Sequence, residues 1–189
     1  MENNTLMHQT ASYIDAGGEK RGSRSEIIGT IVDKPDKTRG KRGRKIVFEE
    51  AGSFPRLKKA LEVCLGSAAD GDFQVGQISV FGTGGEEGPG IEGLEDIFYH
   101  PEAYGMMEFP NIWENGTSDT CGYYVPAYRC NFLYHDLQGN CDIEAAIVSD
   151  EAARNKKRKS GDPKQLDARI AEYSRTPAEA FQRLSSSGF

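Results

Sequence analysis

The chain has 189 residues, which is enough for one ordinary domain or one domain with an extension. Its 23 Lys and Arg residues against 29 Asp and Glu residues give a formal net charge of -6, which excludes a simple basic nucleic-acid coat protein but not a local basic patch. Hydrophobic residues make up 37% and glycine occurs 22 times, so we expect a modest core with much loop. No apolar run approaches the roughly 18 residues of a membrane span, and no secretory signal pattern opens the sequence.

The first segment predicts a β-hairpin. Residues 10–14 form its first strand, and residues 15–19 (DAGGE) supply turn chemistry. Residues 25–32 (SEIIGTIV) are rich in β-branched side chains and form the return strand. The next stretch, residues 33–45, contains seven basic and two acidic residues, and its glycine and proline residues break any helix. We expect a mobile basic loop there.

A strand, a helix and a second strand follow in that order. Residues 46–48 (IVF) predict a short strand buried on both faces, and it ends in Glu49 and Glu50. Apolar residues at helical spacing predict a helix over about 54–65, with Ser53 and Pro55 suited to its start and Gly66 to its end. Residues 77–81 predict a second buried strand. Such βαβ units build parallel sheets that bind ligands at the carboxyl ends of their strands.

The second half of the chain divides into an irregular part and a helical part. From about residue 88 to 139 the sequence is rich in Gly, Pro, Asn and aromatic residues, which indicates short strands and packed loops. Asp142 is suited to cap a helix through about residue 155, and residues 156–161 (KKRKSG) predict a basic break. Asp162 and Thr176 are each suited to cap a further helix. Glu179 occupies the capping-box position after Thr176.

The paired acids at the end of residues 46–48 are the sharpest chemical signal. A nucleotide hydrolase needs one carboxylate near Mg²⁺ and one that orients or deprotonates water. We assign Glu49 to the metal side and Glu50 to the water. Two exposed acids at a strand end, without function, are the alternative.

Two further segments carry weaker signals. The hydroxyl side chains in residues 79–85 (SVFGTGG) end the next strand and could lie beside a γ-phosphate, although the glycines also suit a plain flexible turn. In the basic loop, Arg39, Lys41, Arg42 and Arg44 are candidates for contacts with DNA phosphates or with the nucleotide of a neighbouring subunit. A solvated charged loop is the alternative. Trp113 and the tyrosines favour core positions over base stacking.

Two other kinds of site find little support. The cysteines are Cys64, Cys121, Cys130 and Cys141, and the last three fall within 21 residues together with His135. No C-x2-C pair occurs, so free thiols in a reducing compartment are favoured over a zinc site. The phosphate-binding loop G-x-x-x-x-G-K-S/T is absent from the sequence, and no cluster after residue 142 resembles a metal nuclease.

Three segments in this order resemble the central part of the large terminase subunits of tailed phages. They are residues 22–28 (GSRSEII), 39–54 (RGKRGRKIVFEEAGSF) and 78–85 (ISVFGTGG). In that family a Gly-Ser strand precedes an Arg-Gly loop, which leads directly into the Walker B strand and its acidic pair. A helix and the coupling-motif strand then follow. Residues 98–104 (FYHPEAY), 111–113 (NIW) and 176–181 (TPAEAF) are also similar, so the resemblance covers most of residues 10–182.

The resemblance implies an α/β fold: a partial P-loop ATPase of the ASCE type with a mainly parallel sheet, an irregular region and C-terminal helices. Residues 1–141 would be the C-terminal portion of the ATPase domain, and residues 142–189 a helical linker towards a nuclease domain. Glu50 matches the catalytic glutamate of the family, Glu49 the Mg²⁺-side acid, where aspartate is usual, and Thr83 the coupling-motif residue. The implied cofactors are ATP and Mg²⁺.

The family assembles as a homo-oligomeric ring at the portal of a procapsid in the host cytoplasm. Its partners are double-stranded DNA, the portal protein and the small terminase subunit. The adenine-binding and Walker A segments would lie before residue 1 and the nuclease after residue 189, so we expect the isolated chain to hydrolyse ATP poorly or not at all. Two alternatives remain: a non-catalytic module that binds DNA or a partner, and a fragment of another P-loop ATPase such as a helicase-like protein.

Overall fold

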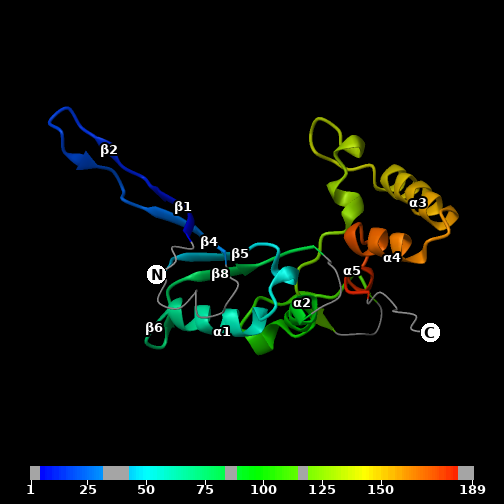
Figure 1. Cartoon of the computed structure of the whole chain (residues 1–189), viewed down its shortest axis with the longest axis horizontal. Helices are drawn as coiled ribbons and strands as arrows, with labels where there is room; N and C mark the ends of the chain where they lie inside the picture. Colours follow the sequence, from blue (N-terminus) through cyan, green and yellow to red (C-terminus); the bar gives the residue numbers. More distant parts are fainter. Residues whose placement is uncertain (1–4, 32–42, 84–88, 115–118, 183–189) are drawn as a thin grey trace.

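The computed structural model describes residues 5–31, 43–83, 89–114 and 119–182. The fold is mixed α/β, and the strands of these residues pair in five two-stranded sheets. Figure 1 shows three parts along the molecule: a long hairpin at one end, a central unit of strands and helices, and a group of helices at the other end.

The predicted hairpin is confirmed. Strand β1 (Thr5–Thr10) pairs antiparallel with β4 (Glu26–Thr30), and β2 (Tyr13–Ile14) pairs with β3 (Lys20–Arg21) nearer the tip. The carboxylate of Asp15 builds the turn, because its Oδ1 accepts hydrogen bonds from the backbone N–H groups of residues 17 and 19 at 2.9 and 3.0 Å. The first strand begins at residue 5, earlier than predicted. The hairpin projects away from the rest of the molecule (Figure 1).

The predicted strand–helix–strand order is also confirmed. Strand β5 (Lys45–Phe48) pairs in parallel with β8 (Gln77–Val80), and α1 (Leu57–Ser67) connects them. A small hairpin of β6 (Ala69–Asp70) and β7 (Phe73–Gln74) lies between the helix and the second strand. Phe48 of β5 joins the main core with apolar residues of the helices, namely Leu57, Ala60, Leu61, Cys64 and Ile97.

The prediction that both strands are buried on two faces is wrong. Val47 is 49% exposed and Phe81, just after β8, is 51% exposed, whereas Phe48 is 3% exposed. Successive side chains of a strand point to opposite faces, and both α1 and α2 (Pro89–Tyr99) cover the face to which Phe48 points. Figure 1 shows these two helices on the same side of β5 and β8. The other face of the pair is open in the described part of the chain.

Helix α1 begins later and ends later than predicted. Residues Ala51–Ser53 form a separate 3-10 turn, η2, and Arg56 occupies the N-cap position of α1. The Ser53 hydroxyl donates to the Glu50 carbonyl oxygen at 2.7 Å, so it serves the preceding turn and not the helix. Gly66 lies inside the last turn of α1, and Ala68 follows as the C-cap.

Helix α2 was missed by the sequence prediction, which treated residues 88–139 as irregular. Its glycines read as loop signals, but Gly90 packs against the backbone of η2 and Gly93 against Leu57. The lack of a side chain at Gly90 lets α2 approach η2 closely. The remainder of the region is irregular, as predicted, with five short elements: η3 (Pro101–Tyr104), β9 (Phe109–Pro110) paired with β10 (Thr120–Cys121), η4 (Ala127–Cys130) and η5 (Phe132–Tyr134).

Three helices close the chain: α3 (Ile143–Lys159), α4 (Pro163–Glu172) and α5 (Pro177–Ala180). All three predicted N-caps are confirmed, since the side chains of Asp142, Asp162 and Thr176 accept hydrogen bonds from backbone N–H groups of the first turns. Glu179 departs from the capping box, because its carboxylate accepts from the N–H of Arg175 and not from that of Thr176.

The predicted break at residues 156–161 is largely wrong. Helix α3 continues through Lys159, and Gly161 adopts a φ of 76° after it. Lys and Arg are good helix formers, and positive charge in the last turn is favoured by the helix dipole. Within the described ranges, no helix combines the length and apolar character needed to cross a membrane.

Candidate functional site

The residues that directly follow β5 and β8 continue to pair with each other beyond the ends of the strands. The N–H of Phe81 donates to the carbonyl oxygen of Phe48 at 3.0 Å, and the N–H of Ala51 donates to the carbonyl oxygen of Phe81 at 3.0 Å. These bonds bring Glu49 and Glu50 to the same sheet edge as Thr83. The sequence therefore predicted correctly that the two chemically suggestive strand ends meet.

Glycine is required where the two strand ends touch. A Cβ on Gly82 would lie 2.8 Å from the backbone nitrogen of Ala51 and 3.3 Å from the carbonyl carbon of Glu50. Backbone atoms cannot move aside as a flexible side chain can. The glycine that ends β8 thus allows the acidic turn to pack directly against the segment that carries Thr83.

Glu50 has an uncommon backbone conformation. Its φ of 53° and ψ of 42° lie in the left-handed region, which costs an L-residue on the order of 1 kcal/mol. Its carbonyl oxygen accepts hydrogen bonds from the N–H of Ser53 at 2.9 Å and from the Ser53 hydroxyl at 2.7 Å. The conformation turns the chain sharply after β5 and leaves the Glu50 side chain exposed at the strand end. Glycine would adopt it at lower cost.

The ligand groups at this edge are oxygens. Glu49, Glu50 and Thr83 are all exposed to solvent. Across the residues whose positions are described, no group of three or more His, Cys, Asp or Glu side chains converges on a common point. Mg²⁺ usually keeps several waters and binds through one or two carboxylates plus phosphate oxygens. The oxygen groups of this edge fit that mode of binding and do not form a closed protein cage.

The structure separates Arg44, one of the basic candidates, from the acidic pair. Arg44 is exposed and precedes β5, where its carbonyl oxygen accepts from the N–H of Gln77 at 2.8 Å. It therefore lies at the opposite end of the strand from Glu49. Arg39, Lys41 and Arg42 lie outside the described residues.

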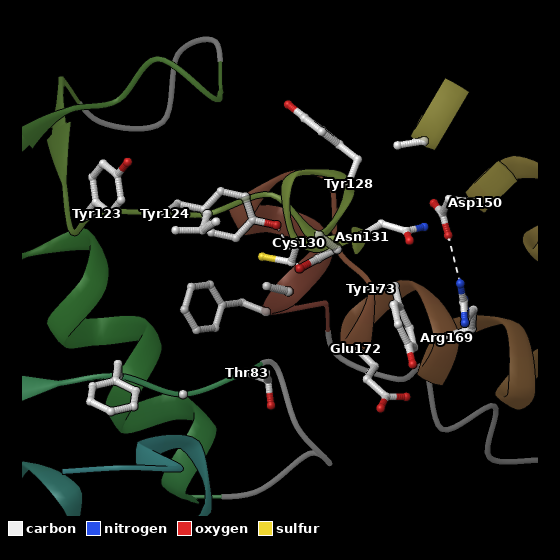
Figure 2. Close-up of a pocket in the computed structure, with 18 of the residues that line it drawn as sticks. Thr83, Tyr123, Tyr124, Tyr128, Cys130, Asn131, Asp150, Arg169, Glu172 and Tyr173 are labelled. Atoms are coloured by element: carbon white, nitrogen blue, oxygen red, sulfur yellow. Dashed lines mark hydrogen bonds and ion pairs between the residues drawn. The ribbon is translucent and has the colours of Figure 1, made fainter. Parts of the chain in front are cut away.

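A cavity of about 900 Å³ lies beside the end of β8. Residues 80–83 form one wall, Phe98 of α2 and residues 123–133 form others, and α3, α4 and α5 complete it. Figure 2 shows Thr83 at the border of this cavity, together with several tyrosines. No sequence pattern predicts this cavity, because its walls come from segments that are far apart in the chain.

Several polar groups that line the cavity contact other protein groups. The guanidinium of Arg169 stacks on the ring of Tyr173, with 3.6 Å between its central carbon and the ring centroid, and its Nη2 lies 3.2 Å from Asp150 Oδ1. The hydroxyl of Tyr124 donates to Ser174 Oγ at 2.8 Å. Burial is the main cause that raises the pKa of Tyr124 to about 12.

The structure shows the burial and contacts of the aromatic residues and of the cysteines. Trp113 is half-buried and packs edge-on against Tyr124, with ring centroids 5.8 Å apart. Tyr13 and Tyr123 are 62% and 67% exposed, so the prediction of core positions for the aromatic residues is confirmed only in part. All four cysteines are free thiols: Cys64 and Cys121 are buried, and Cys141 donates to the carbonyl oxygen of Tyr128 at 3.3 Å. Burial raises the pKa of the Cys121 thiol.

Comparison of the chain with protein-family models, with curated proteins and with solved structures gives no match. Its function is therefore inferred from its own residues and their geometry.

Proposed function

We propose that this chain supplies the Mg²⁺-binding and water-activating half of the ATP-hydrolysing motor that packages double-stranded viral DNA into a procapsid. The observation that carries the proposal is the parallel β5–α1–β8 unit, whose carboxyl edge holds Glu49, Glu50 and Thr83 together. Ligands of parallel sheets bind at that edge. The choice of ATP-driven DNA packaging as the reaction rests on the order of sequence motifs, which resembles that of large terminase subunits.

Each residue of the edge has a role in this proposal. Glu49 binds Mg²⁺, either directly or through water, and Glu50 orients and deprotonates the attacking water. Thr83 places its hydroxyl near the γ-phosphate. The left-handed conformation of Glu50 supports this assignment, because strained backbone concentrates at functional sites.

The 189 residues contain no G-x-x-x-x-G-K-S/T motif, so in this proposal another polypeptide segment supplies the phosphate-binding loop. The 189-residue chain alone is therefore expected not to turn over ATP. In the complete motor, the chain would belong to a homo-oligomeric ring at the procapsid portal in the host cytoplasm, in contact with the portal protein and the small terminase subunit.

The test compares ATP hydrolysis by the 189-residue chain with hydrolysis after a polypeptide that carries a phosphate-binding loop has been joined to it. We expect turnover only from the longer protein. Glu50→Gln should lower that turnover about 10²-fold or more, as for loss of a general base. The matched control is Glu62→Gln, which removes an exposed carboxylate on α1 and should leave turnover unchanged.

Two results would contradict the proposal. Turnover by the 189-residue chain alone that disappears in the Glu50→Gln variant would show a complete site. Turnover of the longer protein that is insensitive to Glu50→Gln would remove Glu50 from the reaction.

A non-catalytic module that binds DNA or a partner is the second candidate. The lack of a phosphate-binding loop and the seven bases in residues 33–45 favour it. Such a module would bind duplex DNA with strong salt dependence and would gain no ATPase activity when joined to a polypeptide that carries a phosphate-binding loop.

A further inference from the structure

The C-terminal end of α3 carries a dense positive charge on an acidic protein. Residues 156–164 hold five bases, Lys156, Lys157, Arg158, Lys159 and Lys164, and one acid, Asp162, which gives +4. The whole chain has a net charge of -6, so the other 180 residues together carry -10. All nine residues of this segment are exposed. We call the five bases the basic end of α3.

The structure makes this segment a preformed surface. The helix includes all four bases of residues 156–159, and it ends where the hydroxyl of Ser160 donates to the carbonyl oxygen of Lys157 at 2.6 Å. A rise of about 1.5 Å per residue concentrates these four cations within roughly 6 Å of helix axis. A loop would let like charges move apart, whereas the helix holds them together.

The bases differ in what they contact. Lys157 Nζ donates to Gln165 at 3.1 Å, and Arg158 Nη1 lies 2.6 Å from Glu151. Lys156 and Lys159 share the outward side of the helix, three residues apart, where side chains are neighbours. In the described part of the chain neither forms an ion pair, and the residues one turn before them, Ala152 and Asn155, carry no charge.

Buried ion pairs anchor α3 just before its basic end. Arg154 lies half a turn before Lys156, is 3% exposed, and its guanidinium binds both oxygens of Glu179 at 2.8 Å. Asp150 binds the guanidinium groups of Arg154, Arg169 and Arg175. These bonds fix α3 to α4 and α5. Lys156 and Lys159 therefore extend from a helix that buried ion pairs hold in place.

We propose that the basic end of α3 binds the phosphate backbone of double-stranded DNA through Lys156 and Lys159, with Lys164 beside them. This inference rests on the proposed packaging function for the choice of polyanion. Lysine ammonium groups act as point charges that neutralise phosphates and read no bases. A motor that moves DNA of any sequence needs contacts of this kind. The site is separate from the predicted basic loop of residues 33–45.

The test measures binding of a fluorescent duplex of about 30 base pairs by anisotropy, over a series of salt concentrations and without nucleotide. The Lys156→Gln/Lys159→Gln variant should bind roughly 10- to 100-fold more weakly near 0.1 M salt, and the slope of log K against log salt should fall by about 1.8. The matched control, Lys20→Gln/Lys59→Gln, changes the net charge equally at two exposed lysines, one on the hairpin and one on α1, and should bind as the unmodified chain does. Figure 1 shows the hairpin and α1 apart from α3. Lys156→Arg/Lys159→Arg should retain binding.

Several outcomes would overturn the inference. They are equal weakening in both glutamine variants, no weakening in the α3 variant, no duplex binding by the unmodified chain, or preferential binding to vesicles of anionic lipid. Circular dichroism of each variant checks that α3 remains folded. Because the assay contains no nucleotide, its failure leaves the Glu50 test intact, and DNA binding without ATPase activity in the longer protein would overturn the packaging proposal alone.

Discussion

Arg154 and Glu179 are 25 residues apart in the chain and form a two-pronged ion pair, with Nη1–Oε1 and Nη2–Oε2 distances of 2.8 Å each. Arg154 also donates to the carbonyl oxygen of Tyr173 at 3.0 Å. Burial tends to raise the pKa of Glu179, but the hydrogen bonds from Arg154 and from the N–H of Arg175 outweigh it, so the pKa lies below its usual value. One buried side chain thus joins the middle of α3 to the end of α4 and to α5.

Replacing Arg154 by Met should destabilise the protein by about 3–5 kcal/mol, because it leaves the carboxylate of Glu179 without its partner. Urea unfolding followed by circular dichroism measures the change. Arg158→Met is the matched control, since its ion pair with Glu151 is solvent-exposed and should contribute only about 0–1 kcal/mol. Similar losses in the two variants would show that burial of Arg154 adds nothing.

The lowered pKa of Asp96 should make the free energy of unfolding depend on pH in the acidic range. The hydrogen bond from Lys58 Nζ, at 2.8 Å, is the main cause that lowers its pKa from 3.8 to about 2, with a further bond from the Tyr104 hydroxyl. The charged carboxylate is favoured in the folded state, so its contribution is complete above pH 3.8 and is lost as the pH falls through about 2.

The measurement is urea unfolding at several pH values for the unmodified chain and for Asp96→Asn. The unmodified chain should be the more stable of the two above about pH 4, and this difference should shrink between about pH 4 and pH 2. Other acids titrate in both proteins and cancel in the comparison. A difference that does not change with pH would contradict the role of the Lys58–Asp96 pair.

Gly90→Ala should destabilise the packing of α2 on η2. A Cβ at this position would collide with the carbonyl oxygen of Gly52 and lie 2.9 Å from that of Phe54. We expect a loss of about 1–3 kcal/mol or more, as for overpacked cores. Gly66→Ala is the control, because its Cβ would meet nothing within 4 Å and α1 should gain about 0.5–1 kcal/mol. Thermal unfolding distinguishes the opposite signs.

Glu50→Gly should separate stability from function. Glycine adopts the left-handed conformation without strain, so the free energy of unfolding should rise by at most about 0.5 kcal/mol, after the added freedom of the unfolded chain is subtracted. The same variant in the longer protein should lose ATP hydrolysis. Glu50→Ala keeps the strain and should show no gain in stability. A destabilised Glu50→Gly variant would mean that the Glu50 side chain stabilises the fold.

Local rules predicted the elements that depend on local contacts. The turn at Asp15 and the caps at Asp142, Asp162 and Thr176 are as expected, because a short polar side chain bonds to backbone only two to four residues away. Helix α2 was not predicted, since its two glycines oppose a helix locally. The close contact of Gly90 with η2, which is distant in sequence, shows why they are present.

The strand–helix–strand order and the meeting of Glu49 and Glu50 with Thr83 followed from the sequence alone. Chain connectivity forces two parallel strands joined by a helix to end at the same edge.

Tertiary structure decided the rest. Both α1 and α2 cover one face, so Val47 and Phe81 remain exposed. The ion pairs of Arg154 join α3 to α5 and to the segment after α4. Contacts between residues far apart in the chain set those features, and no local pattern encodes them.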